Sequence, residues 1–326
     1  MIKKLLICFS IQFLQILPNY SQCKDELNKI LKENNKISTL YKYKDNKKLI
    51  MLKLKNLMEI NKSRKKYGLS LLKLDIVASR VANKHCIEML KYNYAGHWNK
   101  SGFKPYHRYA FAGETDHIGE NLFAKWTTGS FNTNIKSVNK MMLEGHKSFM
   151  AEKFPNNWHK KMVLAQGHTH IGIGFAINKQ SFRYSQMFVN RYVTLKPIPK
   201  IINSPFKLTL EGNIIKSKKN YGPYMLVIYY ETIPSNHFNY KIQPKTYHDF
   251  TNSRFLTIPP WKMKYNDLTG NFMIDINFKD VKNGYYYIKL YVRKNVSSIP
   301  YVLKKRVSIN NSNAVPATGI IIRVKN

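Results

Sequence analysis

Trp158–Ala176, WHKKMVLAQGHTHIGIGFA, is the stretch of this chain that says most about its fold. Its second half alternates apolar residues with glycine over 171–175, a two-residue period that predicts a strand spanning about 169–178. A second apolar run at 182–193 follows the polar turn Asn178-Lys179-Gln180-Ser181. The two runs are therefore expected to form a hairpin at the centre of an antiparallel sheet.

Helices are predicted ahead of this hairpin, because apolar residues recur there at the spacing of one helix face. Gly68 suits the left-handed residue that ends the first helix, and Asp75 can cap the start of the second. Residues 93–135 are rich in Gly, Pro and His and are expected to be mostly loops. The expected helices are 47–66, 76–92 and 135–150.

Beyond Pro197 and Pro199 the helical period disappears and short strand-like runs take over. Short strands separated by turns are typical of a β-sandwich, immunoglobulin-like or related. We therefore expect an all-β domain over 196–326, following a mixed helix-and-sheet domain over 47–195. The runs are Phe206–Leu210, Tyr224–Tyr230, Phe272–Phe278, Tyr285–Val292, Tyr301–Ile309 and Ile320–Val324.

The first 22 residues have the pattern of a secretory signal peptide: a basic start, an apolar run too short to span a bilayer, and a polar exit. We expect a secreted protein, with an uncleaved anchor as the alternative, and no later segment reaches spanning length. Residues 23–46 are polar and lysine-rich and are predicted to form an extended arm with a little helix. Outside the cell, Cys23 and Cys86 can form one disulfide or remain free thiols.

The formal net charge is +36, and the excess is spread along the whole chain and is not confined to a tail. Such a charge favours adhesion to acidic surfaces such as glycosaminoglycan, phospholipid or nucleic acid. A compositional bias toward Lys, Asn, Ile and Tyr would produce the same excess. Secretion argues against nucleic acid as the native partner, and the sequence carries no nucleic-acid-binding motif.

Fragments upstream of the hairpin occur in the order found in one protein family. They are Asn61-Lys62-Ser63-Arg64, Tyr67-Gly68, Gly96-His97-Trp98-Asn99, Gly119-Glu120-Asn121-Leu122 and Glu144, followed by His159 ahead of Gly172-Ile173-Gly174. Together they resemble the CAP superfamily, also called SCP/TAPS, over about residues 47–193. The resemblance implies an α+β fold, an α-β-α sandwich with a histidine and glutamate cleft.

Carried over position by position, the resemblance places His97, Glu120, Glu144 and His159 in one open cleft. Two neutral imidazoles, His97 and His159, can ligate zinc or another divalent metal and leave positions open for water. The carboxylates of Glu120 and Glu144 can orient the imidazoles or serve as candidate acid and base. The alternative is a buried polar network that only holds helices and loops together.

Two departures from the family pattern bear on this cleft. Lys160 and Lys161 follow His159 where the family has an aromatic residue and threonine, and their positive charge would discourage a bound cation. The interval from His97 to Glu120 is also long, so His117 is an alternative source of the first imidazole.

An aromatic segment just before His159 suggests lipid binding, since some members of the family bind sterols or fatty acids beside an aromatic loop. Phe149, Phe154 and Trp158 can line a groove for an acyl or sterol group. The alternative is that these rings pack beneath the loop.

The sequence therefore predicts a secreted CAP-domain protein that acts as an extracellular binding module for a lipid or sterol, a glycan, a membrane surface or a protein. One alternative is a metal-dependent hydrolase that uses His97 and His159 as ligands and Glu120 or Glu144 as general base. A second alternative is a structural adhesive module whose cleft has no ligand.

Overall fold

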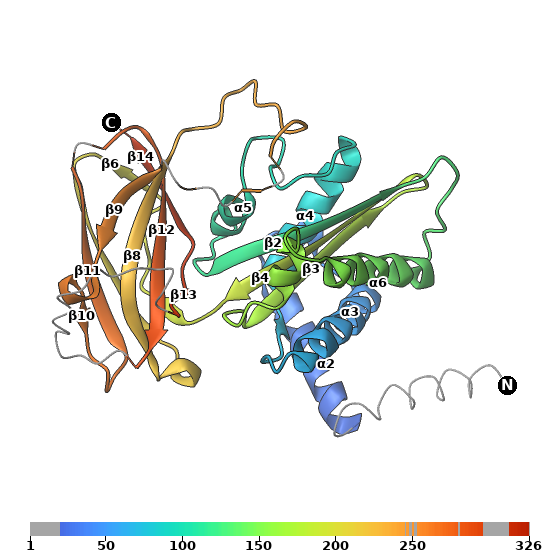
Figure 1. Ribbon diagram of the computed structural model, residues 1–326, viewed down its shortest axis with the longest axis horizontal. Coiled ribbons are helices and arrows are strands. Elements are labelled where there is room, and N and C mark those ends of the chain that lie inside the picture. The colour runs from blue at the N-terminus through green and yellow to red at the C-terminus, as the bar shows by residue number, and fades with distance from the viewer. Residues whose placement is uncertain are drawn as a thin grey trace.

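The computed structural model describes residues 20–244, 246–247, 250, 253–279, 281–295 and 313–325. The signal peptide expected over 1–22 lies outside these ranges except for its last three residues, and the strand expected at 301–309 lies outside them entirely. A mixed helix-and-sheet unit and an all-β unit pack side by side (Figure 1). Within the described ranges, no helix is both long and apolar enough to cross a bilayer.

The N-terminal unit is built on a sheet with the strand order β1-β3-β4-β2, covered by α4 on one face and by α3 and α6 on the other (Figure 1). β3 and β4 form the expected central antiparallel hairpin, whereas β1 runs parallel to β3. This arrangement confirms the predicted α-β-α sandwich. The strands are β1 (Lys73–Leu74), β2 (His117–Trp126), β3 (His170–Ile177) and β4 (Ser181–Asn190), and the helices are α3 (Lys47–Lys66), α4 (Ile76–Lys91) and α6 (Ile135–Ala151).

Local sequence explains where these helices begin and end. The Asp75 carboxylate accepts a hydrogen bond from the Ala78 N–H at 2.7 Å, which caps α4 as predicted. Gly68 follows α3 with φ of +69°, a conformation that glycine adopts at little cost.

The glycines of β3 are required because α4 lies directly on that strand. A Cβ on Gly172 would stand 2.3 Å from the backbone carbonyl carbon of Ala78, and one on Gly174 would stand 2.3 Å from that of Ala82. The two glycines of this Gly-x-Gly pattern therefore form the surface on which the backbone of α4 packs.

The region expected to be mostly loops, 93–135, contains α5 (Pro105–Phe111) and the ten-residue strand β2. The region is still rich in loops, but β2 was not predicted, because its buried polar residues, Glu120 and Asn121, break the apolar alternation. A short helix, α7 (Trp158–Val163), also precedes the hairpin.

The lysine-rich segment 23–46 is mainly helix, not an extended arm, and it packs against the sandwich. It contains α2 (Tyr20–Lys36) and a short 3₁₀ turn, η1 (Tyr41–Tyr43). The Arg80 guanidinium donates to the carbonyls of Asn34, Ile37 and Thr39, and Lys53 pairs with Asp45 at 2.6 Å in a buried salt bridge. These contacts join the segment to α3 and α4.

The C-terminal unit is β-rich, as predicted, and consists of a sheet ordered β10-β11-β7-β5 that packs against a second, β6-β14-β12-β8-β9. The apolar side chains of both sheets form one core. Since β5 pairs with β7, this unit begins near Val193, slightly before the expected boundary at 196. The strands are β5 (Val193–Leu195), β6 (Ile201–Asn203), β7 (Phe206–Ile214), β8 (Tyr221–Glu231), β9 (Arg254–Ile258), β10 (Lys264–Tyr265), β11 (Asn271–Phe278), β12 (Gly284–Lys294), β13 (Val315–Pro316) and β14 (Ile320–Lys325), with 3₁₀ turns η2 (Lys216–Lys218) and η3 (Pro260–Lys262).

The two units meet along the outer edge of β2. The His117 N–H donates to the Ala317 carbonyl at 3.1 Å, and the Gly319 N–H donates to the Thr115 carbonyl at 2.7 Å. Above this edge the Tyr106 ring of α5 stacks on Tyr287 of β12 with centroids 4.2 Å apart. The interface is therefore both hydrogen-bonded and aromatic.

Candidate functional site

The best-defined cluster of predicted site residues surrounds Glu120 of β2, which is 2% exposed. One carboxylate oxygen lies 3.0 Å from Nδ1 of His97. The other accepts hydrogen bonds from Arg108 Nη2 of α5 at 2.7 Å and from Ser185 Oγ of β4 at 3.1 Å. The structure thus brings two of the four predicted residues together and adds an arginine.

The Arg108 guanidinium keeps the Glu120 carboxyl group ionised. Burial alone would raise the pKa of Glu120, but the Arg108 charge and the hydrogen bond from His97 outweigh it and lower that pKa to about 2. Glu120 is therefore an ionised partner of Arg108 at neutral pH. A general base needs a pKa nearer the working pH, so this carboxylate is poorly suited to proton abstraction.

A tyrosine from the C-terminal unit closes the cluster. Tyr247 lies in the connection between β8 and β9, is 3% exposed, and accepts a hydrogen bond from the Glu120 N–H at 2.6 Å. Its ring centroid is 4.5 Å from that of His97. Because β2 is an edge strand, this N–H has no partner strand, and the Tyr247 hydroxyl takes that place. The expected open cleft is covered here.

Replacing Tyr247 with phenylalanine tests this closure. The Y247F variant keeps the ring but loses the acceptor for the Glu120 N–H, so we expect faster amide hydrogen exchange at Glu120 and a loss of about 0.5–1.5 kcal/mol in unfolding free energy. Exchange measured residue by residue should change at Glu120 and stay unchanged at β3 amides. Equal exchange in both proteins would show that Tyr247 does not cover this strand in solution.

The other two predicted site residues have different partners on the opposite face of the sheet. Glu144 pairs with Lys125 at 2.7 Å, and Nδ1 of His159 contacts Glu152. Successive residues of a strand face opposite ways, so Glu120 points toward α4 and α5, whereas Asn121 bonds the His159 carbonyl at 3.0 Å. The expected convergence of His97, Glu120, Glu144 and His159 is therefore not found.

This separation removes the basis for a metal held by His97 and His159. Among the described residues, no group of three or more His, Cys, Asp or Glu side chains is placed to hold a metal ion. The alternative imidazole, His117, lies 3.2 Å from the Tyr287 hydroxyl through Nδ1 and belongs to the interface between the units. The residues present do not fit the expected zinc or other divalent site.

His159 instead helps to fix the start of α7. The Glu152 carboxylate accepts from the backbone N–H groups of His159 at 2.9 Å and Lys160 at 3.2 Å, a favourable place for a negative charge. The His159 ring stacks on Phe149 at 4.8 Å, and Phe149 is only 3% exposed. Phe149 is thus a core residue and does not line a lipid groove.

Phe154 and Trp158 differ from Phe149 because their rings face solvent. Phe154 is 81% exposed and Trp158 is 70% exposed. The Lys161 ammonium lies 5.9 Å from the Phe154 ring centroid and 4.7 Å from that of Trp158. The predicted aromatic loop therefore exists as an exposed surface and not as the expected pocket.

Two partners in these sites, Arg108 and Tyr247, were not assigned roles from the sequence. Arg108 lies between His97 and Glu120 in the sequence, so a cation that could pair with the glutamate was available nearby. Tyr247 lies in the other unit, so no local pattern connects it with Glu120. Cys86, whose expected alternatives were a disulfide or a free thiol, is a buried free thiol.

Comparison with known protein families gives a match within the N-terminal unit. Residues 57–192 match the family model for CAP, the cysteine-rich secretory protein family. This part of the chain is a CAP domain. CAP domains are often found in extracellular proteins. No curated protein matches the chain.

Solved structures similar to this chain include three bacterial proteins. An extracellular protein containing an SCP domain from Bacillus anthracis is 22% identical, with a TM-score of 0.32, over 42% of this chain and 40% of that one. An outer surface protein from Borrelia burgdorferi is 19% identical, with a TM-score of 0.32, over 41% and 89%. A cysteine-rich secretory protein from Staphylococcus aureus is 14% identical, with a TM-score of 0.28, over 42% and 38%. The matched region thus spans only about two fifths of the first and third of these proteins.

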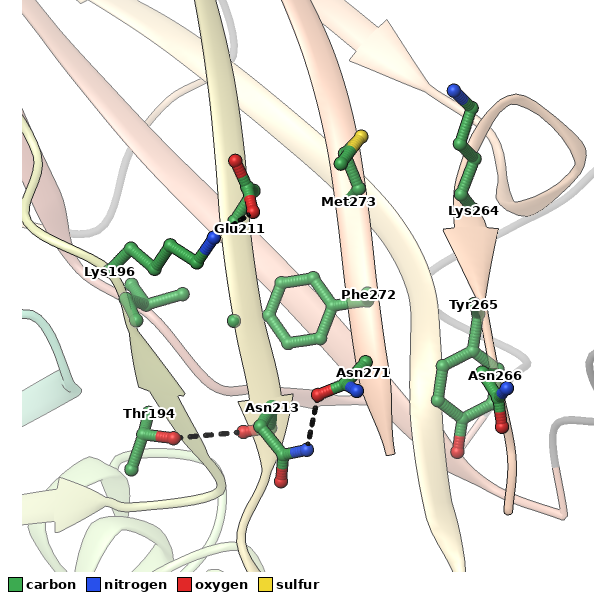
Figure 2. Close-up of a pocket in the computed structure, with 12 residues that line it drawn as sticks. Thr194, Lys196, Glu211, Asn213, Lys264, Tyr265, Asn266, Asn271, Phe272 and Met273 are labelled. Carbon is green, nitrogen blue, oxygen red and sulfur yellow. Dashed lines mark hydrogen bonds and ion pairs between the residues drawn. The ribbon is translucent and has the colours of Figure 1, made fainter. Parts of the chain in front are cut away.

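A depression of about 630 Å³ lies outside the CAP domain, on the sheet that contains β7 and β11 (Figure 2). Several of its polar side chains already have partners. Asn213 Nδ2 donates to the Thr269 carbonyl at 2.9 Å and to Asn271 Oδ1 at 2.7 Å, and Lys196 pairs with Glu211.

Proposed function

We propose that this protein is a secreted, non-catalytic binding module that attaches to polyanionic extracellular surfaces. The observation that carries the proposal is the distribution of charge. The chain has a net charge of +36 and only 18 carboxylate side chains. Ion pairs within the described part of the chain engage nine different carboxylates: Asp45, Glu59, Asp75, Asp116, Glu120, Glu144, Glu152, Glu211 and Glu231.

This pairing leaves the surface strongly cationic. Several pairs are buried or half-buried, including Lys53 with Asp45 and Arg108 with Glu120, and each pair is close to neutral, so the excess positive charge comes from the other basic side chains. The five lysines in these ion pairs are a minority of the lysines in the described part of the chain, and exposed lysines attract acidic partners over a distance of about one Debye length. Acidic glycans and anionic lipid headgroups both present such charge.

The residues expected to form the CAP cleft give little support to a catalytic role. Glu120 is ionised, paired with Arg108 and covered by Tyr247, and the expected metal ligands lie on different faces of the sheet. A hydrolase would need an accessible base or a metal-bound water, and neither follows from this arrangement.

Attachment to polyanions predicts tight retention on heparin resin and co-sedimentation with phosphatidylserine vesicles at low salt. The affinity for heparin and the affinity for the vesicles should each fall at least about tenfold when the ionic strength is raised to physiological values and above. The reason is that salt screens exposed charges. Unmodified agarose and pure phosphatidylcholine vesicles are the matched controls. Absence of heparin retention at low salt, or retention that salt does not weaken, would contradict the proposal.

A further inference from the structure

One surface of the CAP domain combines exposed aromatic rings with lysines, and we call it the aromatic–lysine patch. Phe154 and Trp158 are 81% and 70% exposed, and Tyr67 at the end of α3 is 50% exposed. The Lys160 ammonium lies 6.0 Å from the Tyr67 ring, which links the two segments. The patch comprises Phe154 and Trp158 with Lys161, whose ammonium lies over both rings, together with the pair Lys160 and Tyr67 and with Lys153, the chain neighbour of Phe154.

We propose that this patch docks into the headgroup region of an anionic lipid bilayer. The inference rests on the proposed function and specifies one contact surface and one partner. Tryptophan and tyrosine favour the membrane–water interface, where the ring is shielded from water and its polar atom remains hydrated. Lysines beside such rings pair with anionic headgroups while their stems lie along the apolar layer.

The rings are presented by a fixed framework. Glu152 accepts from the first N–H groups of α7, and Asn121 of β2 donates to the His159 carbonyl. Behind them, Phe149 stacks on both His159 and Tyr184 of the core. α7 is therefore held against the sheet while Trp158, its first residue, faces solvent, so little ordering is needed on docking.

The charges of the patch select an anionic partner. Lys153 and Lys161 are exposed. Glu152, the acidic residue of this loop, turns inward to His159 and the α7 backbone, so it does not neutralise them. An apolar protein groove would match the rings and leave the lysines unpaired, whereas an anionic bilayer matches both.

The test compares the full chain with its F154S/W158S variant on two probes. Phosphatidylcholine vesicles containing phosphatidylserine report docking, and heparin resin reports general attachment to polyanions. We expect the variant to bind the vesicles about tenfold or more weakly, which corresponds to the loss of interfacial burial of two rings, and to elute from heparin at the wild-type salt concentration. W261S is the matched control, because Trp261 is 47% exposed on the C-terminal unit, and it should bind vesicles like the wild type.

The outcomes separate this inference from the proposed function. Equal vesicle binding by F154S/W158S and wild type, with heparin retention intact, would overturn the patch and leave polyanion attachment standing. If the wild type is not retained on heparin at low salt, that result would instead contradict the proposed function. A concentration-dependent dimer that F154S/W158S abolishes would assign the patch to a second copy of the chain, and would also overturn bilayer docking. Thermal unfolding of each variant confirms that the exposed substitutions leave the fold intact.

Discussion

Replacing Arg108 with alanine is expected to lower the unfolding free energy by about 3–5 kcal/mol, because it leaves the Glu120 carboxylate buried without its cation. Arg108 also donates to the carbonyls of His97 and Phe103, so the loop between these two residues loses two further contacts. Chemical denaturation of the full chain measures the change. The matched control is K196A, which breaks the more exposed pair with Glu211 and should cost about 0.2–1 kcal/mol.

The pH dependence distinguishes the lost charge from the lost backbone contacts. In the wild type the folded pKa of Glu120, about 2, lies below its ordinary value of 4.5, so the stability it contributes is present above pH 4.5 and disappears as pH falls through 2. In R108A burial is opposed mainly by His97, so the folded pKa rises. The difference in unfolding free energy between the two proteins should therefore shrink on acidification. A difference independent of pH would mean that Arg108 acts mainly through its carbonyl contacts.

Substituting alanine at Gly172 and Gly174 is expected to have an equally large effect. Each new Cβ would stand 2.3 Å from a backbone carbon of α4, and no side-chain rotation relieves a clash with backbone. We expect each single variant to lose about 3 kcal/mol and the double variant to be largely unfolded, since a domain has only about 5–15 kcal/mol to lose. Circular dichroism during denaturation measures both effects.

Gly129 provides the control for the glycine substitutions. A Cβ there meets only the Thr127 hydroxyl, at 3.7 Å, and the backbone conformation suits any residue. G129A should therefore match or slightly exceed wild-type stability, because alanine restricts the unfolded chain. Wild-type stability in G172A would show that α4 can move away from β3 at little cost.

Much of the CAP fold was predictable because its main elements carry strong local patterns. The apolar period of α3, the Asp75 cap of α4 and the glycine alternation of β3 each agree with the structure. β2 was missed because its buried side chains include Glu120 and Asn121, whose partners come from distant segments. A strand with polar residues at buried positions cannot be recognised from the spacing of its apolar residues.

The candidate site was less predictable than the fold. The pairing of His97 with Glu120 followed from the family motifs, and the structure contains it. Motif order along the chain does not say which face of a sheet a side chain occupies, so Glu144 and His159 were placed in the same cleft although they lie across the sheet. Tyr247 could not be foreseen, because its contact depends on how the second unit packs.

The backbone hydrogen bonds from His117 to Ala317 and from Gly319 to Thr115 join the edge of β2 to the C-terminal unit. They close a strand border that would otherwise be free to pair with a neighbouring molecule. We therefore expect the CAP domain to self-associate through this edge of β2 when the C-terminal unit is unfolded.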